Sequence, residues 1–204
     1  FYSKLDKYHR PKKIYRHKIG SSPKDDQLIF EEKDEGFTCS IDISSDEKYY
    51  IVSTSDHTSS EVHFFNVKEI NIKPKLFKKR QKEIRYSIDS WNGNFFIHTN
   101  LDAEDFKICM CKHDSIQNWK DYIPATKGVL IGSFILLNEW MIRSEVRDAL
   151  SKLYVRNLNI DSEEELIITE EKVISSGASL MQKDRNTNKI YVAYHSPRTP
   201  GYTY

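Results

Sequence analysis

The sequence has few cysteines and no apolar run long enough to cross a membrane. Three cysteines in 204 residues, Cys39, Cys109 and Cys111, are odd in number and too sparse for a disulfide framework. The longest apolar run, Val129–Leu137, is interrupted by a glycine and a serine. It stays well short of the roughly 18 residues that a membrane-spanning helix needs. These features exclude a small disulfide-rich secreted domain and a membrane helix.

Charge of one sign is not in excess either. Lys and Arg together number 31 and Asp and Glu 30, so the net charge is +1 and no overall field attracts DNA, RNA or an anionic membrane. We therefore expect no nucleic-acid or membrane partner. The chain begins FYSKLDKY, without methionine or a signal-peptide pattern, which favours part of a longer protein or a processed chain. Few cysteines and no Asn-x-Ser/Thr sequon fit a reducing cytoplasm.

Short apolar or alternating runs, separated by turn-forming residues, fill the sequence. The runs include TCSIDIS, KYYIVSTS, EVHFFNV, RYSIDS, NFFIHTN, FKICMCK, WMIRSEV, KLYVRNL and KIYVAYH. Separators such as SSPKDD, SSDE, WNGN and DRNTN have the residues that turns prefer. No stretch keeps a 3.6-residue period over three turns. The pattern predicts an all-β protein.

The same runs repeat along the chain. YYIVSTS, FFIHTN, WMIRSE and IYVAYH resemble one element seen four times, which makes Tyr50, Phe96, Met141 and Tyr191 equivalent. Their spacing of about 45 to 50 residues, with about four strands per unit, is typical of a β-propeller blade. A blade cannot bury both faces alone, and stacking neighbours around an axis solves that problem.

The repeat predicts a partial β-propeller of about four blades of four-stranded antiparallel sheets. The expected ranges are 1–32 for the last strands of one blade, 37–80, 84–126 and 129–169 for three full blades, and 173–204 for part of another. Such an open stack leaves two sheet faces uncovered, which invites association.

The stretch STSDHTSSEV brings serine, aspartate and histidine close together in the sequence. A catalytic triad needs its acid, base and nucleophile in one hydrogen-bonded chain, usually assembled from distant segments. Asp56 and His57 are neighbours, so in an extended segment their side chains diverge. The stretch lies between two predicted strands, where Asp, Ser and Thr can bond nearby backbone groups. We interpret it as a hairpin loop.

Other catalytic and cofactor motifs are missing. The nearest match to the G-x-S-x-G nucleophile elbow is Gly177–Met181, which contains Ser179 but lacks the second glycine and a following helix pattern. There is no G-x-x-x-x-G-K-S/T and no H-E-x-x-H, and the seven histidines are scattered. We therefore assign no catalytic or metal residue, leave binding residues unassigned and expect no cofactor.

Four further features have a simple structural interpretation. Cys109 and Cys111 share one face of a predicted strand, but metal sites normally need three or four ligands, so we expect half-buried strand cysteines. The basic run KPKLFKKRQK fits an outer edge strand, where lysines discourage aggregation, better than a phosphate-binding surface. The acidic run DSEEE, residues 161–165, is interpreted as a polar turn. The tryptophans at 91, 119 and 140 do not follow the repeat and are interpreted as packing residues.

Several stretches together resemble oligopeptidase B (protease II) of the prolyl oligopeptidase family. They are, in order, FYSKLDKYHRPKKIYRHKIGSS, DDQLIFEEKDEGFTCSIDISSDEKYYIV, STSDHTSSEVHFFNV, EIRYSIDSWNGNFFIHTNLDAEDFKI, NWKDYIPATKGVLI and VAYHSPRTPGYTY. The matches are collinear over nearly all 204 residues. The sequence departs from the family at residues 195–198, where HSPR replaces a run of small hydroxyl residues, and at Trp91 and Asp105.

The resemblance implies a cytoplasmic serine oligopeptidase with a seven-bladed propeller and an α/β-hydrolase domain, which cleaves short peptides after Lys or Arg. This chain would be the second half of the propeller, which caps the active site, and the hydrolase domain would be absent from it. The implied partners are that hydrolase domain, in the same or a separate chain, and short basic peptides. A homodimer through the open blade faces is a further expectation.

Three hypotheses from different classes stay open at this point. The first is a non-catalytic propeller fragment of such a peptidase. The second is a stand-alone propeller that binds another protein, or the relic of a split or truncated gene. The third, which we consider the weakest, is a hydrolase with an unrecognised site at Ser179.

Overall fold

The computed structural model describes residues 1–69, 71, 73–167, 175–179, 185–197 and 202–203. Strands dominate these residues, and the single helical element among them is one 3-10 turn, η1 (Pro23–Asp25). Five antiparallel sheets are present, which confirms the predicted all-β class. No helix in the described part of the chain is long and apolar enough to span a membrane.

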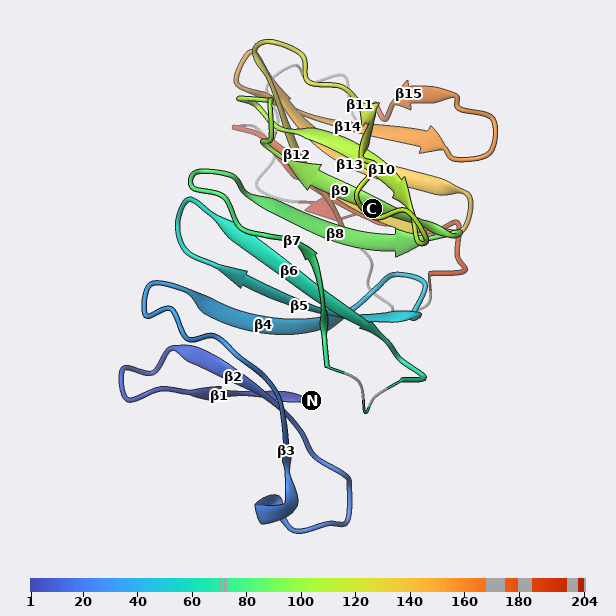
Figure 1. Cartoon of the computed structure of the whole chain (residues 1–204). Coiled ribbons are helices and arrows are strands. Elements are labelled where there is room, and N and C mark those ends of the chain that lie inside the picture. The colour runs from blue at the N-terminus through green and yellow to red at the C-terminus, as the bar shows by residue number, and fades with distance from the viewer. Residues whose placement is uncertain (70, 72, 168–174, 180–184, 198–201, 204) are drawn as a thin grey trace. The chain divides into compact units, whose positions relative to one another are not determined.

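The chain divides into two compact units, and the first comprises Phe1–Asp102 and Cys109–Tyr122. It contains β1 (Tyr2–Leu5), β2 (Pro11–Arg16), β3 (Gln27–Glu31), β4 (Thr38–Ile43), β5 (Tyr49–Ser55), β6 (Ser60–Asn66), β7 (Lys75–Lys78), β8 (Tyr86–Trp91), β9 (Asn94–Thr99) and most of β10 (Lys107–Lys112) and β11 (Lys120–Ile123). These strands form the sheets β1–β3, β4–β7 and β8–β11, which follow one another as successive layers in Figure 1.

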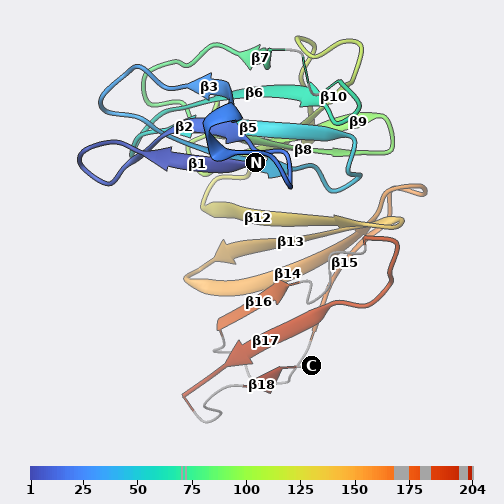
Figure 2. The same ribbon diagram turned by 90° about the horizontal axis from the view of Figure 1, so that it is seen from below.

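The second unit comprises Ala103–Ile108 and Ile123–Tyr204. Its first sheet contains β12 (Val129–Leu137), β13 (Trp140–Arg147), β14 (Leu150–Asn157) and β15 (Glu163–Glu165). Its second contains β16 (Ser175–Ser179), β17 (Tyr191–His195) and β18 (Tyr202–Thr203). Strand β16 lies beside β14, as Figure 2 shows.

Strand order within every sheet follows the order along the chain. Each strand therefore pairs with the strand next to it in the sequence. Turn-forming residues lie between paired strands, as the sequence predicts. Between β8 and β9, Asn92 and Gly93 both have positive φ, 49° and 81°, as a type I′ turn requires. The separator WNGN is thus confirmed as a tight hairpin turn.

The repeated element predicted from the sequence is the second strand of its sheet in all four cases: β5, β9, β13 and β17. One equivalence was wrong by a residue. Tyr50 packs on the side of its sheet that faces the preceding one, and in the next sheet Phe95, not Phe96, packs on that side. The offset arises because five residues separate β4 from β5, whereas the two-residue turn Asn92–Gly93 separates β8 from β9.

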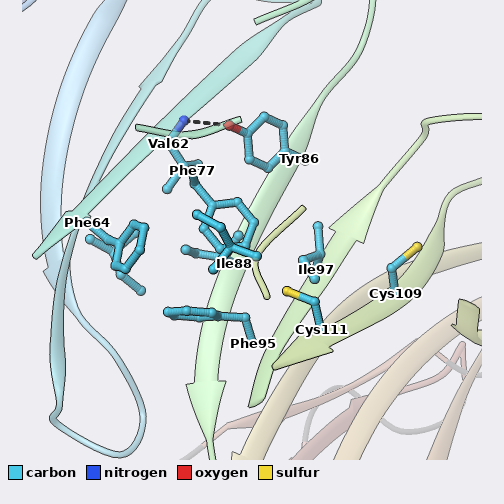
Figure 3. Packing of buried hydrophobic residues seen from close by; sticks show 11 residues of the cluster. Val62, Phe64, Phe77, Tyr86, Ile88, Phe95, Ile97, Cys109 and Cys111 are labelled. Atoms are coloured by element: carbon cyan, nitrogen blue, oxygen red, sulfur yellow. Dashed lines mark hydrogen bonds between the residues drawn. The ribbon is translucent and has the colours of Figure 1, made fainter. Parts of the chain in front are cut away.

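Sheet β4–β7 buries apolar side chains on both faces. On one face, Ile51, Val62, Phe64 and Phe77 pack against residues of sheet β8–β11, including Phe95, Ile97 and Cys111, as Figure 3 shows. On the other face, Val52 and Phe65 pack against Ile14 of β2. Phe77, Phe95, Ile97, Val52, Val62 and Ile14 are completely buried. Burial of this kind stabilises a fold by about 1.5–3 kcal/mol per large side chain.

The acidic run at residues 161–165 differs from its predicted turn. Glu163–Glu165 form strand β15, which pairs with β14, so only the first two residues of the run lie outside a strand. Basic side chains explain the pairing: Lys152 of β14 lies 2.8 Å from Glu165, and Arg143 of β13 is hydrogen-bonded to Glu163. Opposite charges on β13 and β14 thus stabilise a short edge strand that apolar residues do not hold.

Tyr86 at the start of β8 joins its sheet to sheet β4–β7. Its hydroxyl accepts a hydrogen bond from the Val62 N–H at 2.9 Å (Figure 3). The same hydroxyl donates one to the Lys78 carbonyl. Its backbone N–H donates to the Ser60 hydroxyl at 2.6 Å, and that hydroxyl donates to the Tyr86 carbonyl at 2.7 Å. Burial raises the pKa of Tyr86, so the hydroxyl keeps its proton and both of its bonds.

Replacing Tyr86 with phenylalanine should therefore leave a buried N–H and a carbonyl without their partner. We expect the free energy of unfolding to fall by about 1–3 kcal/mol, measured by urea denaturation. Tyr8→Phe is the matched control, since Tyr8 is 61% exposed and its change should stay within about 0.5 kcal/mol. Equal effects of the two substitutions would contradict a joining role for Tyr86.

Candidate functional site: the joints between neighbouring sheets

The stretch STSDHTSSEV forms a hairpin loop between β5 and β6. Asp56 Oδ1 accepts hydrogen bonds from the backbone N–H groups of Thr58, at 2.7 Å, and Ser59, at 2.6 Å. These bonds hold the pKa of Asp56 below its ordinary value. The His57 side chain next to it is exposed. The predicted use of Asp56 to stabilise the turn is confirmed, and the loop shows no triad geometry.

A different set of Ser, His and Asp side chains does meet, at the joint between sheets β4–β7 and β8–β11. Ser90 of β8 has its hydroxyl oxygen 2.9 Å from Asp46 Oδ2 and 2.9 Å from His113 Nε2. His113 Nδ1 lies 3.2 Å from the Tyr49 hydroxyl. The sequence does not reveal this network because its hydrogen-bonded pairs are separated by 23 to 64 residues and share no motif.

The order of these groups differs from that of a catalytic triad. In a triad the acid orients the imidazole, whereas here Asp46 accepts from the Ser90 hydroxyl and a tyrosine holds the other side of His113. Ser90 is completely buried, so its hydroxyl cannot reach a substrate. Burial also lowers the pKa of His113, which keeps the imidazole neutral at pH 7. The network joins two sheets and is not a nucleophilic site.

Further hydrogen bonds from Ser45 and Asp46 complete this joint. The Ser45 N–H donates to Asp89 Oδ1 at 2.7 Å, and the Ser45 hydroxyl donates to Asp89 Oδ2. The Asp46 N–H donates to the Ser90 carbonyl at 3.2 Å. The turn after β4 is therefore held at β8 by both its side chains and its backbone.

The joint between sheets β1–β3 and β4–β7 uses charge instead. Arg80, which follows β7, lies 2.6 Å from Glu32 and 3.3 Å from Glu61 through Nη2. Its backbone N–H also donates to Glu61 Oε2 at 2.9 Å, and its guanidinium stacks 3.9 Å from the Phe37 ring centroid. Burial by itself raises the pKa of Glu61, but the bonds from Arg80 outweigh burial and hold that pKa below its ordinary value.

Lysine 12 contributes to the same joint from β2. It is 8% exposed, and its Nζ donates to the Asp34 carbonyl at 2.6 Å and to the Phe37 carbonyl. A buried ammonium requires such partners because leaving it unpaired costs several kcal/mol. Lys12 and Arg80 thus hold the connecting segment 32–37 from two sides.

The remaining residues selected from the sequence have structural roles. Cys109 and Cys111 share a face of β10 as predicted, but they are buried rather than half-buried. Burial raises the pKa of the Cys111 thiol to about 11, so it stays protonated. Ser179 is the last residue of β16 and pairs with Tyr191 of β17. Within the described residues, no group of three His, Cys, Asp or Glu side chains is placed to hold a metal ion.

The basic run forms the outer edge predicted for it. Lys75–Lys78 constitute β7, the last strand of its sheet, where one side of the backbone is unpaired. Lys78 Nζ lies 4.1 Å above the Trp119 ring, and Trp119 packs against the buried core. Trp91, with 6% exposure, is a buried packing residue too.

Comparisons with known proteins agree with this architecture. The family model described as "Prolyl oligopeptidase, N-terminal beta-propeller domain" matches residues 1–204, and the chain belongs to this family. The chain is 26% identical over its whole length to "Protease 2" of Moraxella lacunata and 28% identical, over 95% of its length, to "Dipeptidyl aminopeptidase BI" of Pseudoxanthomonas mexicana.

Solved structures of oligopeptidase B share the fold. Oligopeptidase B from Trypanosoma brucei, in a closed form with covalently bound antipain, superposes with a TM-score of 0.93 at 23% identity over all of this chain. The enzyme from Leishmania major gives 0.91 at 17% identity over 99% of the chain. The chain spans 29% and 27% of the two curated relatives and 30% of each of these two structures.

Removing the Arg80 guanidinium should leave two acidic side chains buried without a counter-charge. We expect Arg80→Met to lower the free energy of unfolding by about 2–4 kcal/mol. This loss is smaller than that for a fully buried ion pair, because Arg80 is itself partly exposed. Lys82→Met is the control, because its side chain is 90% exposed and its ion pair should contribute little. Denaturation of both variants in urea measures the difference, and a small effect of Arg80→Met would contradict an ionic joint.

The buried histidine predicts a dependence of stability on pH. Because the pKa of His113 is lower in the folded protein than its ordinary 6.5, the unfolded state binds more protons below that pH. Stability should therefore fall as the pH decreases from about 7.5 to 5.5. His113→Gln should reduce this slope, whereas His57→Gln in the exposed loop should leave it unchanged. Part of the slope should remain, because burial lowers the pKa of His63 as well.

Proposed function

We propose that this chain is the substrate-gating propeller portion of an oligopeptidase B-like serine peptidase that cleaves short peptides after Lys or Arg. One observation carries the proposal: the propeller-domain family covers residues 1–204, while the chain spans less than a third of its relatives. The Ser90, His113 and Asp46 side chains support this division of labour, because they meet in a buried joint.

In this proposal the chain is a cytoplasmic, partial propeller with blades at 37–80, 84–126 and 129–169 and blade remnants at 1–32 and 173–204. Its partner is the α/β-hydrolase domain of the same enzyme. The joints hold neighbouring sheets in a fixed arrangement, so that the propeller admits short peptides and excludes folded proteins. Catalytic residues and the carboxylates that recognise Lys or Arg belong to the hydrolase domain.

A second candidate function is that of a stand-alone interaction module. An uncovered face of sheet β1–β3 favours it: Tyr2 stacks on Tyr15 with centroids 5.7 Å apart, and Leu28 beside them is 44% exposed. A second copy of the chain could cover such a face and give a homodimer. The oligomeric state in solution distinguishes a self-associating module from a monomeric fragment.

Peptidase activity tests the first proposal directly. The 204-residue chain should be inactive alone on an Arg-containing fluorogenic peptide, and activity should appear when it is mixed with the separately expressed hydrolase portion of the enzyme. A matched peptide with proline in place of arginine is the control for specificity. Activity of the chain alone would contradict a non-catalytic role, and preference for proline would contradict cleavage after basic residues.

A further inference from the structure

The edge strand β15 differs from β7 and β11, which hold the same place in the two four-stranded sheets before it. Strand β7 buries Phe77 completely, and β11 ends at Ile123, which is 6% exposed. All three residues of β15 are exposed, so no buried side chain anchors Glu163–Glu165 in the sheet. Besides its backbone pairing with β14, basic side chains hold this strand. We call them the basic set: Arg143, Lys152 and Arg156.

Arg143 of β13 is the buried member of the basic set. It is 4% exposed, and its guanidinium lies over the Tyr154 ring of β14, 4.6 Å from the ring centroid. It reaches across β14 to Glu163, where Nη1 donates to Oε2 and Nη2 donates to Oε1 at 3.0 Å. Its Nε and Nη2 also donate to Glu145 Oε1, at 3.2 and 2.8 Å. Such paired N–H bonds fit the planar carboxylate and are stronger than bonds between neutral groups.

The two other members of the basic set come from β14. Lys152 Nζ lies 3.0 and 2.8 Å from the two carboxylate oxygens of Glu165. Arg156 Nη1 lies 3.4 Å from Glu163 Oε2, and its Nη2 donates to Asp161 Oδ1, just before the strand. Each acidic side chain on this face of β15 is therefore bound by a basic side chain of another strand.

The spacing of the glutamates matches the position of the basic set. Successive side chains of a strand point to opposite faces, so Glu163 and Glu165 share the face that carries the basic set, while Glu164 lies on the other face. The basic set itself belongs to β13 and β14, which pair with each other over eight residues, so it is built without β15. An extended segment with the pattern Glu-x-Glu is thus the ligand that this edge of the sheet fits.

The ion pairs that retain β15 are partly open to water. The side chains of Lys152 and Glu165 are 30% and 37% exposed, and that of Glu163 is 24% exposed. Exposed ion pairs contribute little to stability and are weakened further by salt. A three-residue strand held in this way separates from its sheet more readily than one anchored by a buried phenylalanine. Once β15 separates, β14 presents an unpaired backbone edge beside three basic side chains.

We infer that the edge of β14, together with the basic set, is a docking site for an acidic, extended segment of a partner protein. Strand β15 is the resident occupant of this site, and the partner displaces it. The partner adds its own strand to β14 and places two glutamates, two residues apart, on the basic set. This site goes beyond the proposed peptidase role and depends on no part of it.

The place of β15 in the chain argues for a partner protein and against a second copy. Sheet β16–β18 follows β15 and belongs to the same compact unit. Exchange of β15 between two copies would therefore also carry away β16, which lies beside β14. A separate acidic segment enters at the edge of β14 and leaves that packing in place.

Binding of a labelled peptide to the full chain tests the site. The probe is NIDSEEELI, the sequence of residues 159–167, followed by fluorescence anisotropy. Glu163→Gln combined with Glu165→Gln removes the charges of the resident strand with little change of shape. This variant should bind the probe about tenfold or more tightly than the unmodified chain, because its own strand competes less. Glu164→Gln is the matched control: it removes a charge on the other face, and binding should stay as in the unmodified chain.

Further variants identify the groups that bind the probe. With the double-Gln variant as receptor, a probe that carries glutamine in place of both of these glutamates should bind about tenfold more weakly. Adding Arg143→Lys to that receptor should weaken binding of the original probe similarly, because an ammonium cannot make the paired bonds. Lys152→Gln, at a partly exposed position, should give a smaller loss in the same direction. Slow amide exchange in β13 shows that the sheet of each variant is folded.

Three results would overturn the inference. The first is no binding of the probe to the double-Gln variant while β13 stays protected. The second is equal binding of the glutamate and glutamine probes, which would show a strand added without recognition of its carboxylates. The third is a concentration-dependent dimer of the unmodified chain that is lost on Glu163→Gln, because the occupant would then be a second copy. None of these readouts involves peptidase activity, so the docking site can fail while the proposed enzyme function holds, and the reverse.

Discussion

Sheet β4–β7 has apolar side chains buried on both of its faces, and this constraint governs how the neighbouring sheets pack on it. In sheet β4–β7, Ile51 and Val52 are adjacent in sequence, point to opposite faces, and are both buried. A sheet of this kind is unstable in water until a neighbour covers each face. Stacking of neighbouring sheets is thus a condition for the folding of this sheet.

Apolar packing alone does not fix the position and orientation of one sheet on the next. Directional polar contacts between the sheets fix them. Hydroxyl, imidazole and carboxylate groups join β8 to the turn after β4, while Arg80 and Lys12 join the neighbouring pair of sheets. Such groups are tolerated in a buried position because each finds its partners, and loss of one partner leaves the others unsatisfied. The chain belongs to the prolyl oligopeptidase propeller family. In the proposed gating role, these contacts would keep neighbouring sheets in place.

Local features of the sequence were enough to predict most of the strands, the hairpin turns and the repeat. Asn92–Gly93 and Asp56 form their turns through contacts within a few residues of their own positions. Side-chain and backbone preferences determine the turn conformation over that range. The Ser90 network could not be predicted because its partners meet only after two sheets have formed. The acidic run at 161–165 was interpreted as a turn because it has no apolar pattern, whereas Glu163–Glu165 pair as strand β15 through charges on other strands.

The two joints also imply that the repeating units are not interchangeable. In sheet β4–β7, Arg80 requires a carboxylate such as Glu32 at one boundary, and the turn that presents Ser45 requires an aspartate such as Asp89 at the other. A different order of the sheets would bring a guanidinium to a boundary that has hydroxyl groups. Such mismatched groups would lack partners and would destabilise that order. The polar groups at each boundary thus favour one order of these three sheets over the others.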